Sequence, residues 1–163
     1  MILYQEPGEE QLLVGILYIP KIILLYVYIM INIYVGSQHG NAEGIANEIY
    51  GRLKEINENL EINIYPLNKL LEHIGSNKII IISSTTGNAD IPDNAYKFWM
   101  KVKKRTLEKN YFENMSYLIL GLGDTNYSFF CAAAKKISKR LKELGANELN
   151  SLVTMDDEVN DYD

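Results

Sequence analysis

Residues 36–44 of this chain, Gly-Ser-Gln-His-Gly-Asn-Ala-Glu-Gly, gather hydrogen-bond donors in a short glycine-containing segment. Hydroxyl, amide and backbone N–H groups are present there, but Lys and Arg are not. At the start of a helix, these donors suit a phosphate held by neutral hydrogen bonds and the helix dipole. The segment lacks the Gly-Lys-Ser/Thr of a Walker loop and the G-x-G-x-x-G dinucleotide fingerprint. Taken alone, a plain turn between a strand and a helix explains it equally well.

Two further segments are polar and contain glycine: 84–93, Ser-Thr-Thr-Gly-Asn-Ala-Asp-Ile-Pro-Asp, and 121–131, Gly-Leu-Gly-Asp-Thr-Asn-Tyr-Ser-Phe-Phe-Cys. Each could be an ordinary surface loop. If all three segments follow neighbouring parallel strands, however, they surround one crevice at the carboxyl edge of a sheet, where ligands bind in such folds. The first segment would supply phosphate donors, and Tyr127 a flat ring for stacking, with Phe129 and Phe130 anchoring its loop from behind.

The elements that would position these segments alternate between strand and helix. Short apolar runs rich in β-branched residues predict strands at 29–35, 60–65, 78–83, 117–122 and 148–153. Apolar positions at helical spacing predict helices over 42–58, through 95–102 and through 134–144. Asp93 is the expected N-cap of the second helix, and Gly145 closes the third. This alternation predicts an α/β fold with a parallel sheet covered on both faces.

Composition excludes several classes of function and site. The chain has 163 residues, enough for one domain, and a net charge of −5, which gives nucleic-acid binding no electrostatic support. Cys131 is the only cysteine, so no internal disulfide forms and a reducing compartment is expected. His39 and His73 are too far apart in sequence to indicate a zinc site. Five acids in the last eight residues account for the excess negative charge, and they would be solvated or dock a basic partner.

Residues 1–28 form a separate hydrophobic N-terminal segment, with an almost continuous apolar run from residue 12. About 20 apolar residues can cross a bilayer, so this run is compatible with membrane contact. Pro20-Lys21 interrupts it, and it runs into the first predicted strand without a linker. Three interpretations stay open: an N-terminal anchor, an extra buried or swapped segment, and a stretch foreign to the mature protein. The folded domain is expected to comprise residues 29–163.

Taken together, the three loops resemble those of the NADPH-dependent diflavin reductases. Y-V-G-S-Q-H-G-N-A-E is similar to that family's phosphate loop, S-Q-T-G-T-A-E, and S-S-T-T-G-N-A-D-I-P-D-N-A resembles its second flavin loop. G-L-G-D-T-N-Y-S-F-F-C-A-A-A-K-K-I resembles the third loop and the helix after it. The resemblance covers roughly residues 31–158. It is strongest to methionine synthase reductase-like proteins, and NADPH–hemoprotein reductases and the cytosolic diflavin reductase of iron–sulfur assembly are close rivals.

The resemblance implies a flavodoxin-like, doubly wound sheet of five parallel strands in the order 2-1-3-4-5. A helix is expected after the fifth strand of such a sheet, but acids follow there, so the C-terminal helix is expected to be missing and an apolar strip to be exposed in its place. The resemblance implies FMN as cofactor and assigns the FMN phosphate to Ser37, Gln38, His39, Gly40, Asn41 and Ala42. It places Thr85, Thr86, Gly87 and Asn88 at the edge of the isoalloxazine ring. The other side of the ring is assigned to Leu122, Gly123, Asp124, Thr125, Asn126, Tyr127, Phe130 and Cys131, with Tyr127 stacked on it. Asp156 matches a family acid near the flavin.

Several positions depart from the family pattern. His39 and Asn41 replace two threonines, although both can donate hydrogen bonds. Ala89 stands where a glycine is usual, and Met155 replaces another. Thr86 is not aromatic, which predicts one-sided stacking. Outside the resemblance, Cys131 and Trp99 are expected to be core residues, and Asp124 could be simply a turn residue.

The function implied is electron transfer from NADPH through FAD to FMN and then, one electron at a time, to a protein acceptor. FAD and NADPH would bind a downstream reductase module that is absent here, so the chain alone is not expected to oxidise NADPH. A free-standing flavodoxin-like carrier and a flavin-free scaffold domain are the alternatives. The expected partners are that reductase module and an acceptor protein. The expected location is cytoplasmic, with residues 12–28 allowing contact with the cytosolic face of a membrane.

Overall fold

The computed structural model describes residues 30–74 and 78–156. Segment 1–28, and with it the proposed anchor at 12–28, lies outside the described residues, as do residues 157–163 of the acidic C-terminus. Within the described part, no helix is both long and apolar enough to span a bilayer.

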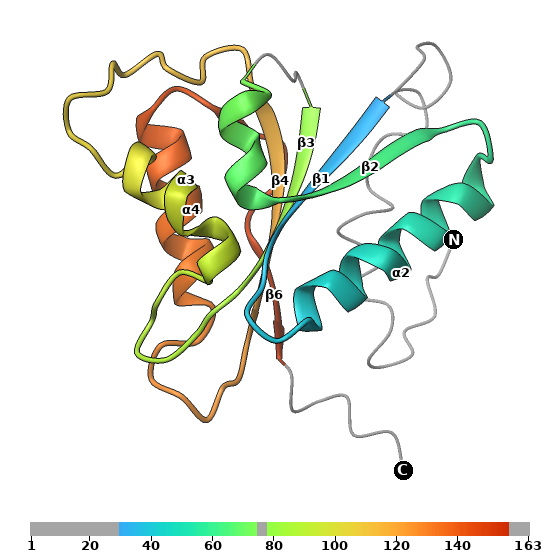
Figure 1. Cartoon of the computed structure of the whole chain (residues 1–163), viewed down its shortest axis with the longest axis horizontal. Helices are drawn as coiled ribbons and strands as arrows, with labels where there is room; N and C mark the ends of the chain where they lie inside the picture. The colour runs from blue at the N-terminus through green and yellow to red at the C-terminus, as the bar shows by residue number, and fades with distance from the viewer. Residues whose placement is uncertain (1–29, 75–77, 157–163) are drawn as a thin grey trace, which may run out of the picture.

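Strands form one parallel sheet (Figure 1). The path is β2-β1-β3-β4-β5, and β6 also pairs with β4, which confirms the predicted order. The strands are β1 (Met30–Gly36), β2 (Glu61–Pro66), β3 (Lys78–Ser84), β4 (Ser116–Gly123), β5 (Asn147–Glu148) and β6 (Val153–Asp156). Long parallel registers join β1, β3 and β4, so the strands that carry the three loops lie next to one another.

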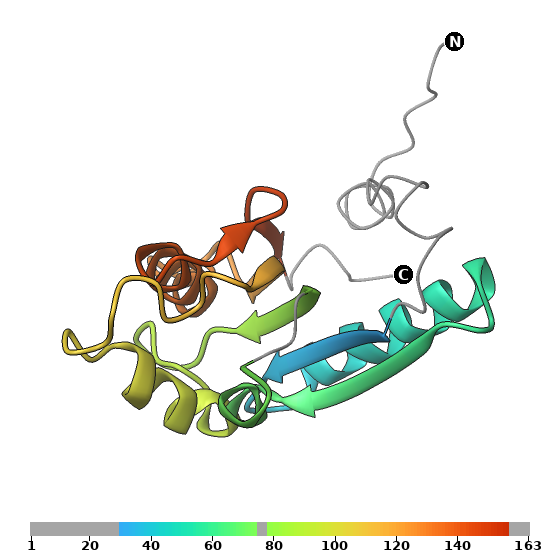
Figure 2. The same ribbon diagram turned by 90° about the horizontal axis from the view of Figure 1, so that it is seen from above.

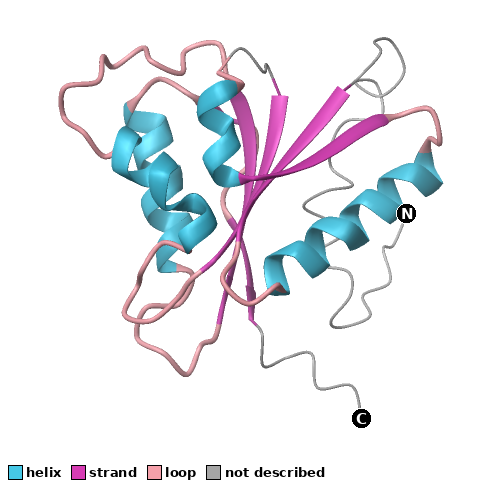
Figure 3. Ribbon diagram, viewed as in Figure 1, coloured by secondary structure: helices cyan, strands magenta, loops and turns pink. Residues whose placement is uncertain are grey.

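Helices cover both faces of the sheet (Figures 1 and 3). Helix α2 (Asn41–Ile56) packs on one face, while α3 (Asp93–Val102), α4 (Ala132–Glu143) and the 3₁₀ helix η1 (Leu67–Glu72) pack on the other. Figure 2 shows α2 and α3 on opposite sides of the central strands. In β3 the side chains alternate between the two cores: Ile79 and Ile81 face α3 and α4, and Ile80 and Ile82 face α2.

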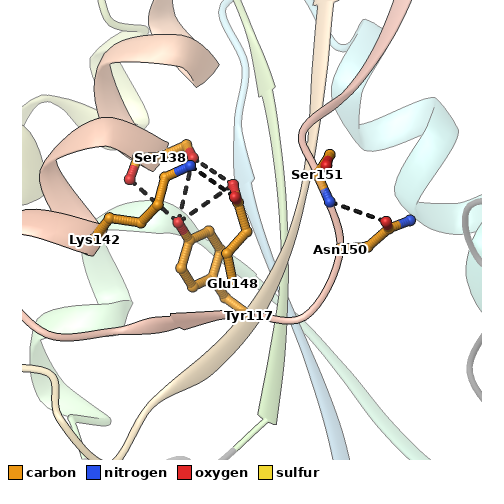
Figure 4. Close-up of polar contacts among 6 residues, drawn as sticks. All are labelled: Tyr117, Ser138, Lys142, Glu148, Asn150 and Ser151. Atoms are coloured by element: carbon orange, nitrogen blue, oxygen red, sulfur yellow. Dashed lines mark hydrogen bonds and ion pairs between the residues drawn. The ribbon is translucent and has the colours of Figure 1, made fainter.

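The predicted fifth strand, 148–153, is divided into two short pieces. Both β5 and β6 pair with β4, one at its start and the other near its end. Leu149 N still donates to Tyr117 O of β4 (2.9 Å), and residues 150–152 then leave the sheet. Ser151 N donates to Asn150 Oδ1 (2.9 Å), a local bond of the kind with which Asn competes against strand pairing (Figure 4). The apolar run alone did not reveal this interruption.

A polar network fastens β5 to α4 (Figure 4). The buried Tyr117 hydroxyl lies 3.2 Å from Ser138 Oγ, and Ser138 Oγ donates to Glu148 Oε1 (2.6 Å). Lys142 Nζ forms an ion pair with Glu148 Oε2 (2.7 Å). Burial raises the pKa of Tyr117 to about 12, and the nearby Glu148 adds to that rise. Burial also opposes ionisation of Glu148, but hydrogen bonds from Lys142 and Ser138 outweigh it and hold the pKa of Glu148 below its usual value.

The apolar strip expected from a missing helix is less exposed than predicted. Leu118, Val153 and Met155 on the α2 side of β4 and β6 are half-buried at the margin of that core. Trp99 is likewise half-buried, and it packs against the core beneath α3 and α4 as expected.

Candidate functional site

Three loops meet at the carboxyl edge of the sheet. Strand β1 ends at Gly36, which pairs with Ser83, and Ser83 pairs in turn with Gly121 on β4. The segments that follow these strands are therefore neighbours, with the loop after β3 in the middle. The sequence placed all three loops at this edge, and the register shows them there.

The loop after β1 leads directly into α2. Ser37 is buried, and its Oγ accepts a hydrogen bond from Gly40 N (3.1 Å). Gly40 has φ +97°, in the left-handed region that favours glycine, and α2 begins at the next residue. No side chain of the described residues caps the helix by a hydrogen bond, so the positive end of its dipole opens toward the exposed residues 38–41. A Cβ at Gly40 would meet no atom within 4 Å, so the space beside this helix end is open.

The first turn of α3 holds this loop in place. The side-chain amide of Gln38 pairs with Asp93 in both directions: Nε2 donates to Asp93 Oδ2, and Oε1 accepts from Asp93 N, each at 3.1 Å. Ser37 N donates to Asn94 Oδ1 at 2.8 Å. The prediction that Asp93 is an N-cap was wrong, because Pro92 is the cap residue and no side chain caps the helix. The Asp93 carboxylate binds Gln38 instead.

The loop after β3 folds back on itself. The backbones of Thr86 and Asp90 exchange two hydrogen bonds (3.2 and 2.7 Å) around a tight turn. Both Gly87 (φ 46°) and Ala89 (φ 68°) adopt left-handed conformations in that turn. Lys136 Nζ on α4 donates to Ala89 O (2.6 Å). The left-handed backbone at Ala89 explains why the family usually has a glycine at this position.

The loop after β4 is fastened to β6. Asp156, the last residue of β6, accepts hydrogen bonds from the backbone N (3.2 Å) and the side-chain hydroxyl of Thr125. Asp124 Oδ1 accepts from Asn126 N (2.7 Å), so Asp124 does shape the turn. The resemblance predicted Asp156 near this site, and its carboxylate lies against the third loop.

Tyr127 protrudes from this loop with 69% of its surface exposed. Phe129 is also exposed (52%), so the prediction that it anchors the loop from behind was wrong. Phe130 is half-buried and packs close to Gly123, where a Cβ would lie 3.2 Å from the ring. That same Cβ would lie 2.7 Å from Cys131 N, so Gly123 permits the chain to turn tightly onto α4.

Not every residue assigned to the site by sequence can offer its side chain there. Leu122 (1% exposed) packs in the core between α2 and the sheet, and Ala42 is fully buried on the face of α2 that packs against this core. Each could therefore contribute backbone groups to the site, but not its side chain. Cys131 is buried and its Sγ donates to Gly121 O (3.2 Å), which confirms its prediction as a core residue. Thr85 Oγ1 accepts from Ala133 N (3.2 Å) and joins the second loop to α4. Sequence reasoning missed Asn94, which contacts the first loop from 57 residues away.

Comparison with known proteins identifies the family. The model of the family described as flavodoxin matches residues 33–163. The chain belongs to the flavodoxin family. Solved flavodoxins share its fold, among them a cysteine-to-serine mutant of flavodoxin from Pseudomonas aeruginosa (TM-score 0.65, 23% identity, covering 80% of this chain and 85% of that one). Oxidised flavodoxin 2 from Bacillus cereus gives a TM-score of 0.64 at 26% identity, covering 78% and 84%.

Curated relatives are larger oxidoreductases. Methionine synthase reductase of Caenorhabditis elegans is 36% identical over 125 residues, which is 76% of this chain and 18% of that protein. NADPH-dependent diflavin oxidoreductase 1 of Schizosaccharomyces pombe is 34% identical over 124 residues, 74% of this chain and 21% of that protein. This flavodoxin-family chain therefore spans about a fifth of the length of these relatives. The resemblance to diflavin reductases is confirmed as a similarity of sequence.

The residues present fit FMN. A phosphate needs hydrogen-bond donors, and the uncapped N-terminus of α2 with its open space at Gly40 supplies them. A planar ring needs a flat partner, and Tyr127 is exposed in the loop two strands away. This arrangement at the carboxyl edge of β1, β3 and β4 is capable of holding a ligand with one anionic end and one flat aromatic end.

Proposed function

We propose that this chain is the FMN-binding electron-transfer domain of an NADPH-dependent diflavin oxidoreductase. The observation that carries the proposal is the uncapped start of α2 beside two loops held at the same edge of the sheet. Similarity to methionine synthase reductase and NADPH-dependent diflavin oxidoreductase 1 supports the choice of enzyme class.

In this proposal the phosphate of FMN lies against residues 37–42. Two N–H groups of that loop are already engaged, Ser37 N with Asn94 and Gly40 N with Ser37 Oγ. The side-chain amide of Gln38 is engaged with Asp93 as well. The phosphate would therefore be held by the Ser37 hydroxyl, by the backbone N–H of Gln38, by donors of His39 and Asn41, and by the N–H of Ala42. The absence of Lys and Arg from the loop leaves neutral donors and the helix dipole to stabilise the anion.

The flavin ring would lie between the second and third loops. Residues 85–88 would face its edge, and residues 122–127 with Phe130 would line the other side, where Leu122 and the neighbouring Cys131 could contribute backbone groups only. FMN supplies reversible redox chemistry when it is bound, and the protein's part is to bind and orient it and to tune its potential. Tyr127 would stack on one face of the ring and exclude water from it.

The partners belong to the same proposal. A separate FAD/NADPH module would reduce this domain, and the domain would pass electrons one at a time to an acceptor protein. The lone, buried Cys131 supports a cytoplasmic, reducing location. A free-standing flavodoxin-like carrier is the second candidate, and it is favoured by the extent of the match to solved flavodoxins.

A reconstitution assay tests the proposed electron path. The FMN-loaded chain is mixed with the FAD/NADPH module of a diflavin oxidoreductase, and NADPH-dependent cytochrome reduction is followed by absorbance. We expect no steady NADPH oxidation by the chain alone, because it contains no dinucleotide fingerprint. We expect the module's activity to rise when the FMN-loaded chain is added but not when the flavin-free chain is added. NADPH oxidation by the purified chain alone would contradict the proposal.

A further inference from the structure

Asn94, in the first turn of α3, joins the loop after β1 to helix α2. Its Oδ1 accepts from Ser37 N at 2.8 Å, and its Nδ2 lies 3.5 Å from Glu43 Oε1. A backbone N–H can only donate, so the oxygen of the Asn94 amide must face Ser37. The NH₂ group must then face Glu43, and the two contacts together fix the orientation of the side chain.

Glu43 is unusual because only one of its two carboxylate oxygens takes part in a contact described above. Its Oε2 is shielded from solvent and has no hydrogen-bond partner among residues 30–74 and 78–156. A buried oxygen without a donor costs stability. Its negative charge in the first turn of α2 interacts favourably with the helix dipole but repels a phosphate bound at the same helix end. A direct role for Glu43 in holding an anion is therefore unfavourable, whereas its contact with Asn94 is a role that needs an acceptor at this place.

We infer that Asn94 is a positioning residue for the phosphate-binding loop, residues 37–42, and that Glu43 orients Asn94. This inference rests on the proposed function. With Ser37 N bound to Asn94, and Gly40 N bound to Ser37 Oγ, two inward N–H groups of the loop are satisfied within the protein. The loop is then held in one conformation, and its remaining donors stay directed at the ligand. Loss of Asn94 leaves Ser37 N without this acceptor, and the loop is then held to α3 only by the pairing of Gln38 with Asp93.

The consequence is selectivity for the phosphate. Riboflavin has the same ring as FMN but no phosphate. An effect confined to the phosphate-binding loop therefore changes the affinity for FMN and leaves the affinity for riboflavin unchanged. The readout is the ratio of the two affinities, measured on the full chain by quenching of flavin fluorescence. General damage to the fold would weaken both ligands together and leave the ratio unchanged.

Asn68 provides the matched control. Its Oδ1 accepts from Phe98 N (2.9 Å) and its Nδ2 donates to Asp93 O (3.4 Å), so it supports the start of α3 without touching the loop after β1. We expect Asn94→Ala to weaken FMN about fivefold, the effect of losing one hydrogen bond of about 1 kcal/mol, and riboflavin less than about twofold. We expect Asn68→Ala to leave the ratio at its wild-type value.

The pairing with Glu43 is tested by exchanging donor and acceptor. Glu43→Gln keeps an acceptor for Asn94 and removes a charge that opposes the phosphate, so it should keep the ratio or raise it. Glu43→Ala removes the same charge but leaves Asn94 without an acceptor, so its ratio should be lower than that of Glu43→Gln. Asn94→Asp keeps an oxygen for Ser37 N but faces Glu43 with a second carboxylate, so it should also lower the ratio. Combining Asn94→Asp with Glu43→Gln restores one donor, one acceptor and the original charge, and should restore the ratio.

Three results would overturn the inference: a wild-type ratio in Asn94→Ala, an equal loss of both ligands in that variant, or no rescue in the double variant. The double variant keeps both polar side chains, so it serves as the test even if Asn94→Ala does not fold. Equal binding of FMN and riboflavin by the unmodified chain would contradict the proposed function instead, and so the two failures are distinguishable.

Discussion

Tyr127 exposes 69% of its surface, although backbone hydrogen bonds on both sides define its loop, from Tyr127 N to Asp124 O (3.1 Å) and from Ala132 N to Phe129 O (3.0 Å). An exposed ring on an ordered loop is suited to a planar ligand. A stacked aromatic contributes about 0.5–1.5 kcal/mol beyond the area that it buries. Thr86, in the opposite loop, offers no second aromatic ring.

We predict that Tyr127→Ala weakens FMN about 10-fold or more, which corresponds to about 1.4 kcal/mol per decade. Titration of flavin fluorescence measures the change. The melting temperature of the apoprotein should hardly move, because the side chain packs against little in the absence of ligand. Phe129→Ala, in the same loop and also exposed, is the control and should have a smaller effect. Intact FMN affinity with a large fall in apoprotein stability would show that Tyr127 is a core residue.

Ala89 combines a buried methyl group (5% exposed) with a left-handed backbone at φ 68°. That backbone costs a residue with a Cβ roughly 1–2 kcal/mol, which glycine avoids, although glycine loses more entropy on folding. We predict that Ala89→Gly leaves the free energy of unfolding within about 0.5 kcal/mol or raises it, whereas Ala46→Gly inside α2 lowers it by about 1 kcal/mol. Urea unfolding of both variants makes the comparison. An equal loss at both positions would contradict a conformational role for Ala89.

The sequence predicted where the loops lie more successfully than what each residue does. Loops were placed correctly because each follows an apolar strand, and parallel strands share a carboxyl edge. Burial could not be predicted within the loops, so Leu122 and Ala42 were assigned to the site although their side chains lie in the core. Asn94 was missed because its partner, Ser37, is far away in sequence and no local sequence pattern predicts such a contact.

At the scale of elements, the sheet and helices agree with the apolar periodicity, and the disagreements have local causes. The divided fifth strand reflects the Asn150–Ser151 turn. The start of α3 differs because the Asp93 carboxylate is bound by Gln38, a residue of another element. In the first case a local side-chain bond competes with strand pairing, and in the second a side chain from another element takes the carboxylate that would cap the helix.

Tyr117, at the junction of β4, β5 and α4, should make the stability of the fold depend on pH. Tyr117 has its pKa raised to about 12 from an ordinary value of 10.0, chiefly by burial. Below pH 10 the phenol is neutral in both the folded and the unfolded chain. As the pH rises from 10 to about 12, the unfolded chain loses this proton first, so the stability that Tyr117 confers is progressively lost.

We therefore predict that Tyr117→Phe lowers stability by about 1 kcal/mol at neutral pH, because one buried hydrogen-bonding group is removed. Its disadvantage relative to the wild type should shrink between pH 10 and 12. Urea unfolding at several pH values measures this difference, and Tyr96→Phe, at an exposed position of α3, is the control. A disadvantage that stays constant throughout this range would show that Tyr117 is not the titrating group.

At the scale of the whole molecule, the two ends of the sheet have different tasks. The polar network of Tyr117, Ser138, Lys142 and Glu148 fastens the amino end of β4 to α4 (Figure 4). The carboxyl end carries three loops that side-chain hydrogen bonds tie to helices and strands, and it leaves the start of α2 open. Stability and ligand binding are thus separated in space, which permits variants of one end without loss of the other.

The central claim is that this open edge binds FMN through its phosphate. Titration of the full apoprotein with FMN and with riboflavin, followed by fluorescence quenching, tests that claim most directly. A charge-assisted hydrogen bond contributes about 1.5–3 kcal/mol, so even one bond to the phosphate corresponds to about 10-fold or more. We predict that FMN binds at least about 10-fold more tightly than riboflavin. Equal affinity for the two flavins would contradict the assignment of residues 37–42 as a phosphate site.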